Sequence, residues 1–138
     1  MKKQKKAIID TYESFYPVLL VVANKYATAK DINKEFCWYD GVDLSESDLN
    51  GCGGCMLKVI RKSDRSRCVL VKINDDDSVS KNKRENDLLV AVHEAAHVAL
   101  TTYSLTEDRI CCDDFKQEPF CYYIEWVFKC IYKTLTKK

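Results

Sequence analysis

Glycine and proline are scarce in this sequence, and neither sign of charge dominates it. Its 138 residues include four glycines and two prolines. That is too few for a loop-rich disulfide scaffold, so long regular elements should dominate. Lys and Arg number 22 against 21 Asp and Glu, which gives a net charge of +1. This balance argues against a nucleic-acid partner, because the basic face of such a binder normally shows in the total.

Long apolar runs are also missing. The longest clean stretch, from Val18 to Ala23, is too short for a membrane span or for the core of a signal peptide. We therefore expect a cytoplasmic protein that has no membrane partner and whose eight cysteines are reduced. No internal repeat and no Gly/Ser/Pro linker divides the chain, so residues 1–138 are predicted to form a single domain.

The order of the hydrophobic patterns predicts an α+β fold. Apolar side chains recur every three or four positions between residues 5 and 28, which is helical spacing, and Pro17 should kink that N-terminal helix or divide it into two abutting helices. Two segments rich in β-branched residues, 57–61 and 68–73, should form a small antiparallel sheet as a hairpin. Residues 36–39 fit either a short strand or the end of a helix.

Two more helices are expected in the second half of the chain. The first covers about residues 84–103 and is strongly apolar. The second covers about residues 118–135, and Pro119 fits its first turn, where no backbone donor is required.

Both histidines of the chain fall in one pentapeptide, His93-Glu94-Ala95-Ala96-His97. Positions four apart lie on the same face of a helix, so the two imidazoles can bind one Zn²⁺. The glutamate beside the first histidine can take a proton from a water molecule at that metal. The HExxH pattern also occurs by chance, but the placement of the only two histidines on an apolar helix favours a metal site.

A catalytic zinc site needs three protein ligands and one open position, and the sequence has no third histidine. Glu118 follows His97 by roughly twenty residues, a gap that lets a loop turn and a second helix return. The spacing therefore favours Glu118 as the third ligand. Four residues in the intervening loop remain rivals for that role, namely Cys111, Cys112, Asp113 and Asp114.

The run HEAAH, followed by QEPFCYYIEW at 117–126, resembles the short HExxH proteins of phages and mobile elements. Those proteins carry an E-x-F-A-Y helix after the metal helix, and Cys121 stands here in place of the alanine. They are similar in plan to the minimal gluzincin core and to ImmA/IrrE-type metallopeptidases. The resemblance covers about residues 84–130. It implies a minimal zincin-like fold with His93, His97 and Glu118 as zinc ligands and Glu94 as general base.

These features predict a zinc metallopeptidase that hydrolyses a peptide or protein substrate. Glu94 would move the proton, and Tyr122 or Tyr123 would donate to the developing oxyanion, although packing is the commoner role of such tyrosines. The strand at 69–73 or its partner is expected to offer an edge to an extended peptide.

The same ligands would also serve a zinc-stabilised, non-catalytic interaction module that binds a host or regulatory protein partner. An open fourth metal position would favour the enzyme, and a fourth protein ligand would favour the module. The motif Cys52-Gly53-Gly54-Cys55 is compatible with a redox pair or with half of a structural metal site. It precedes a strand and does not open a helix, so a glycine turn with two incidental thiols is the favoured interpretation.

Overall fold

The computed structural model describes residues 5–51, 53–74, 82–110 and 117–137. Its strands are β1 (Ile9–Tyr12), β2 (Leu19–Ala23), β3 (Phe36–Cys37), β4 (Gly54–Arg61) and β5 (Arg67–Ile73). Its helices are α1 (Ala29–Ile32), the 3-10 helix η1 (Glu46–Leu49), α2 (Lys83–Leu105) and α3 (Glu118–Leu135). The structure is α+β, as the sequence predicts.

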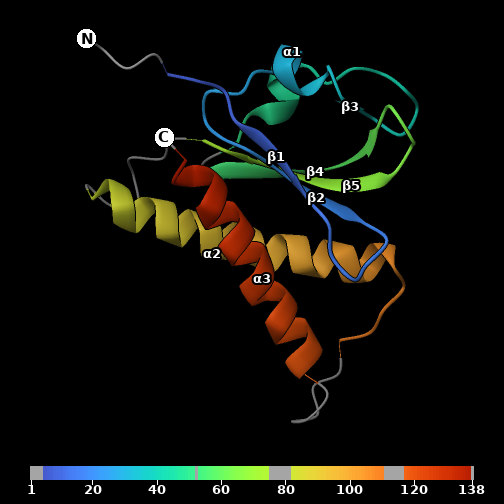
Figure 1. Ribbon diagram of the computed structural model, residues 1–138, viewed down its shortest axis with the longest axis vertical. Coiled ribbons are helices and arrows are strands. Elements are labelled where there is room, and N and C mark those ends of the chain that lie inside the picture. The colour runs from blue at the N-terminus through green and yellow to red at the C-terminus, as the bar shows by residue number, and fades with distance from the viewer. Residues whose placement is uncertain (1–4, 52, 75–81, 111–116, 138) are drawn as a thin grey trace.

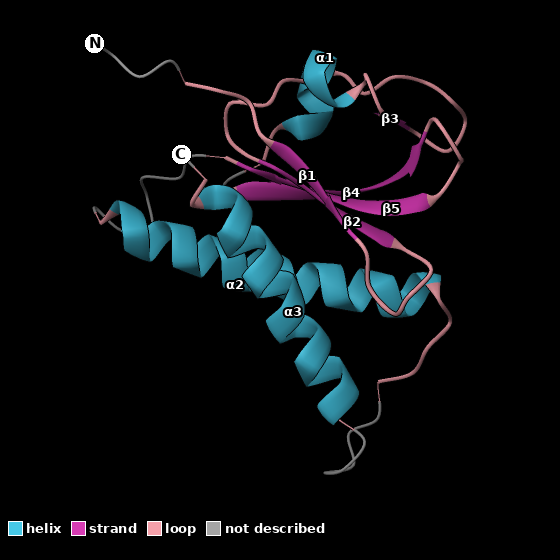
Figure 2. Ribbon diagram, viewed as in Figure 1, coloured by secondary structure: helices cyan, strands magenta, loops and turns pink. Residues whose placement is uncertain are grey.

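The strands form one sheet in the order β1-β2-β5-β4-β3 (Figure 2). Helices α2 and α3 cover one face of this sheet, and α1 lies on the other side (Figure 1). Side chains alternate between the two faces along β5: Val69 and Val71 pack toward α2 and α3, whereas Leu70 packs toward α1. All three are fully buried, so the sheet divides two apolar cores.

The prediction of an N-terminal helix is wrong, because residues 9–12 and 19–23 are strands. β1 and β2 pair antiparallel, and β2 then pairs parallel with β5, so the sheet is mixed and not simply antiparallel. β2 is a central strand whose residues 20–23 are all buried, and such a strand forms an uninterrupted apolar run without alternation. Pro17 lies in the connection between β1 and β2 and kinks no helix.

The hairpin and the two long helices match the predictions, whereas the short helices α1 and η1 were not predicted. β4 and β5 form the expected antiparallel hairpin, and residues 36–37 form the short strand β3. α2 and α3 cover the two predicted helices, with Pro119 in the first turn of α3. The side chain of Asn82 caps α2 by accepting hydrogen bonds from the amides of Arg84 and Glu85.

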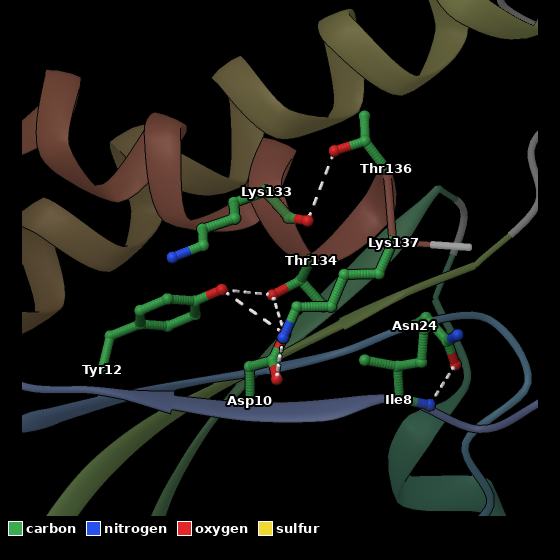
Figure 3. Close-up of polar contacts among 8 residues, drawn as sticks. All are labelled: Ile8, Asp10, Tyr12, Asn24, Lys133, Thr134, Thr136 and Lys137. Carbon is green, nitrogen blue, oxygen red and sulfur yellow. Dashed lines mark hydrogen bonds and ion pairs between the residues drawn. The ribbon is translucent and has the colours of Figure 1, made fainter.

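A polar cluster ties the end of α3 to β1 (Figure 3). The hydroxyl of Thr134 donates to the Asp10 carboxylate at 2.7 Å and lies 2.7 Å from the hydroxyl of Tyr12. Lys137 donates to the other carboxylate oxygen of Asp10 at 2.6 Å. Because Thr134 is fully buried, these bonds fix where α3 crosses the sheet.

Candidate metal centre

His93 and His97 lie one turn apart near the middle of α2, as their spacing predicts. Their Nε2 atoms are 3.1 Å apart, and the two rings meet edge to face with centroids 4.7 Å apart. Both side chains are exposed on the outer face of the helix. The structure therefore brings together the two histidines that the sequence predicts as ligands.

The separation of the two nitrogens fits a shared zinc ion. A tetrahedral zinc with Zn–N bonds of about 2.0–2.1 Å holds two ligand nitrogens roughly 3.3–3.4 Å apart. The 3.1 Å spacing is close to that value, and Nε2 is a common zinc-binding atom of histidine. The same spacing also allows one imidazole to donate a hydrogen bond to the other, so the spacing alone does not require a metal.

Glu94 lies between α2 and the sheet, beside the face of the helix that carries the two histidines. Its side chain is buried, with 4% exposed. A Cβ atom built on Gly54 would lie 3.0 Å from its Oε1, so the carboxylate lies against the first residue of β4. Burial raises the pKa of Glu94, and the neighbouring His93 and His97 act in the opposite direction. A buried carboxyl beside two imidazoles is suited to moving a proton.

The structure does not group the predicted third ligand with the two histidines. Glu118 is exposed at the first residue of α3. The helix contacts α2 through Thr102 and Tyr103, and with 3.6 residues per turn Thr102 lies on the opposite side of α2 from His93. Within the described residues, no three His, Cys, Asp or Glu side chains are grouped so that they could hold a metal ion. Zinc binding by Glu118 stays a prediction.

The rival ligands fall outside the described part of the chain. Cys111, Cys112, Asp113 and Asp114 all lie in the segment 111–116, which the structure does not describe. Of the predicted zinc ligands, the described residues therefore bring only His93 and His97 together.

The two tyrosines predicted as oxyanion donors have different surroundings. The hydroxyl of Tyr123 is 3.1 Å from that of Thr102 and is buried between α2 and α3. Tyr122 is 65% exposed and lines an aromatic cleft at the start of α3. The contacts described for Tyr122 and Tyr123 do not involve His93 or His97. The oxyanion role of either tyrosine therefore stays a prediction.

The edge of the sheet nearest to Glu94 belongs to β4. β5 lies between β2 and β4, so it is not the edge that an extended peptide could join. β3 pairs with β4 only at Ile60 and Arg61, and the stretch from Gly54 onward pairs with β5 alone among the described strands. That stretch of β4 begins where the Glu94 carboxylate lies.

The cysteine motif contributes one residue to this region. Cys52 lies outside the described residues, and Cys55 is half-buried in β4, where its thiol donates to the carbonyl of Leu49 at 3.5 Å. Burial raises the pKa of the Cys55 thiol, which disfavours the thiolate that redox chemistry needs. The role of Gly54 was not predicted, although a glycine inside a strand is a known sign of close backbone approach.

The outer face of α2 is not covered by the described residues. Leu89, Val92 and Leu100 are each about half exposed beside the two histidines. By length and composition alone α2 could also cross a membrane, a test that core helices of soluble proteins pass as well. The opposite face of α2 packs in the core through residues such as Ala95 and Val98.

Comparisons with family models, with curated proteins and with solved structures found no match for the chain.

Proposed function

We propose that this protein is a zinc-dependent metallopeptidase of the minimal zincin-like type, acting on a peptide or protein substrate. The observation that carries the proposal is the 3.1 Å separation of the His93 and His97 nitrogens with a buried glutamate between them in sequence. His93 and His97 would hold the metal, with Glu118 as the predicted third ligand. When bound, zinc supplies polarisation of the scissile carbonyl and of the attacking water.

The chain's own residues would supply proton transfer and substrate binding. Glu94 takes the proton from the attacking water and returns it to the leaving amine. Gly54 leaves room for that carboxylate, and residues 56–59 of β4, between the contacts with residues 49–51 and the pairing with β3, would accept the main chain of an extended peptide by strand addition. The peptide bond would then lie between the edge of the sheet and α2.

The proposed setting is the cytoplasm of a bacterium carrying a phage or mobile element. The five cysteines that the structure describes are free thiols, which agrees with a reducing compartment.

The deciding experiment measures bound metal and peptide cleavage on the same samples. Wild type should bind about one zinc per chain, and His93→Ala should lose it. Glu94→Gln should keep the zinc and lower cleavage of a casein or peptide-library substrate by about a hundredfold or more. Glu107→Gln, which alters an exposed carboxylate just beyond α2, is the matched control and should leave both properties unchanged. Absence of zinc from the wild-type protein would end the proposal.

A second candidate is a zinc-stabilised interaction module with a regulatory protein partner. The half-exposed Leu89, Val92 and Leu100 beside the histidines favour it, because an apolar helix face is a common docking surface. In that case Glu94→Gln changes no measurable activity, while a chelator lowers the melting temperature. Zinc binding without any cleavage by wild type would select the module over the enzyme.

A further inference from the structure

An aromatic cleft lies apart from the histidine pair, between the β1–β2 connection and the first turns of α3. Its volume is about 640 Å³, within the range of small-molecule sites. Figure 1 shows the connection reaching down from the sheet toward the helices. Five aromatic side chains line the cleft, namely Phe15, Tyr16, Tyr122, Tyr123 and Trp126.

The inner rings of the cleft are held in place by their own contacts. Tyr16 and Tyr123 meet edge to face with centroids 4.9 Å apart, and Tyr123 stacks on Trp126 at 5.6 Å. The hydroxyl of Tyr16 donates to that of Tyr103 at 2.7 Å, and the hydroxyl of Tyr123 pairs with Thr102. Both hydroxyls make hydrogen bonds inside the protein. The inner wall therefore presents mainly aromatic carbon, and few hydrogen-bonding groups, to a ligand.

The charge in the cleft is negative. Glu13 is the one charged residue among the described residues that line it, and no Lys or Arg is found there. Aromatic ring faces also carry partial negative charge, so rings and carboxylate together attract a cation and repel an anion. A quaternary ammonium has no N–H groups to satisfy, so the scarcity of hydrogen-bonding groups on the inner wall does not disfavour it.

We propose that this cleft binds a quaternary ammonium group, through the rings of Tyr122, Tyr123 and Trp126 and the carboxylate of Glu13. Two rings at its mouth are left in water: Phe15 is fully exposed and Tyr122 is 65% exposed. A bound trimethylammonium group would cover apolar ring surface that otherwise faces solvent. The group can come from a small molecule such as choline or from a trimethylated lysine side chain, since both present the same head.

Tryptophan fluorescence gives a direct test, because the chain has two tryptophans. Trp38 lies away from the cleft, where its Nε1 donates to Asp48, so Trp38→Phe leaves Trp126 as the sole reporter. Titrating this variant with choline chloride should give a saturable change in emission. The uncharged isostere 3,3-dimethylbutan-1-ol has the same shape and should bind at least tenfold more weakly. Equal binding of the two probes, or no saturable change with choline or with a trimethyllysine peptide, would overturn the proposal.

Two substitutions in the Trp38→Phe background test the assigned residues. Glu13→Gln and Tyr122→Leu change exposed side chains, so the fold should be kept, and each should weaken choline binding by about threefold to thirtyfold. Unchanged binding in both variants would contradict the proposal. A peptide with one trimethyllysine, compared with its unmethylated form, separates the two sources: preference for the methylated peptide over choline indicates a protein partner, and the reverse indicates a small molecule.

Discussion

Gly54 on β4 leaves open the space that the carboxylate of Glu94 on α2 occupies. A Cβ atom at position 54 would lie 3.0 Å from Oε1 of Glu94 and 3.1 Å from the carbonyl oxygen of Lys72. Both distances are shorter than an ordinary van der Waals contact. The close approach of the helix to this end of the strand therefore depends on the missing side chain at position 54.

Gly54→Ala should destabilise the protein by about 1–3 kcal/mol, because the added methyl group overpacks a filled space. Urea unfolding at neutral pH measures this loss. Glu94→Ala removes the carboxylate that the methyl group meets, so the Gly54→Ala change should cost less in that background. Additive effects of the two substitutions would show that residues 54 and 94 do not compete for the same space.

Glu118→Gln tests the third zinc ligand. If Glu118 binds the metal, the neutral amide should weaken zinc affinity by at least the roughly tenfold to hundredfold lost when a residue that only hydrogen-bonds to a metal ligand is changed. Competition with a chromophoric chelator measures the affinity, and Glu125→Gln is a matched control, since its carboxylate pairs with Lys129 at 3.0 Å on the same helix. If Glu118→Gln binds zinc as tightly as wild type, Glu118 is not the third ligand. The rival ligands Cys111, Cys112, Asp113 and Asp114 would then be tested next.

The predictions that succeeded depend on residues close together in sequence. The i, i+4 spacing of His93 and His97 brings their nitrogens together on a helix, and the long apolar run of α2 made that helix easy to recognise. The hairpin of β4 and β5 was equally local. In contrast, the side of α2 on which Glu118 lies depends on how α2 and α3 cross, which no spacing along the chain specifies.

The N-terminal error has a physical cause. The apolar residues Ile8, Tyr12, Phe15 and Leu19 mimic helical spacing, while the run from Leu19 to Ala23 is buried on both faces and so shows no strand alternation. A short apolar run fits a strand or a helix equally well, and pairing with β5 decides between them. The aromatic cleft was missed for the same reason, since one wall of it is the connection that follows β1.

Thr134→Val should destabilise the protein by about 1–2 kcal/mol, because a fully buried hydroxyl that bonds to Asp10 and Tyr12 is lost. Thermal or urea unfolding measures the change. Thr136→Val is the control, since that hydroxyl is exposed and bonds only within its own helix end. If Thr136→Val and Thr134→Val lose the same amount of stability, the polar cluster around Asp10 does not stabilise the fold.

The Asp10 carboxylate should make this stabilisation pH-dependent. Burial raises the pKa of Asp10, but the hydrogen bonds from Lys137, Thr134 and Tyr12 together lower it below its ordinary value. A lowered pKa in the folded state means that the carboxylate stabilises the fold above about pH 4 and stops doing so as pH falls through the lowered pKa. The stability difference between wild type and Asp10→Asn should therefore shrink steadily below pH 4. A constant difference down to pH 2 would contradict this account.

Among the described cysteines, Cys121 should react first with iodoacetamide in the folded protein. Its side chain is exposed on α3, whereas burial raises the pKa of Cys68 and of Cys130 to about 11. Alkylation requires the thiolate and access to it, so at pH 8 the two buried thiols should react at least tenfold more slowly. Peptide mapping by mass spectrometry follows each site, and Cys121→Ser should remove its fast phase. In urea the described cysteines should react at similar rates; equal rates for Cys121, Cys68 and Cys130 without urea would mean that α3 and β5 open freely in the native state.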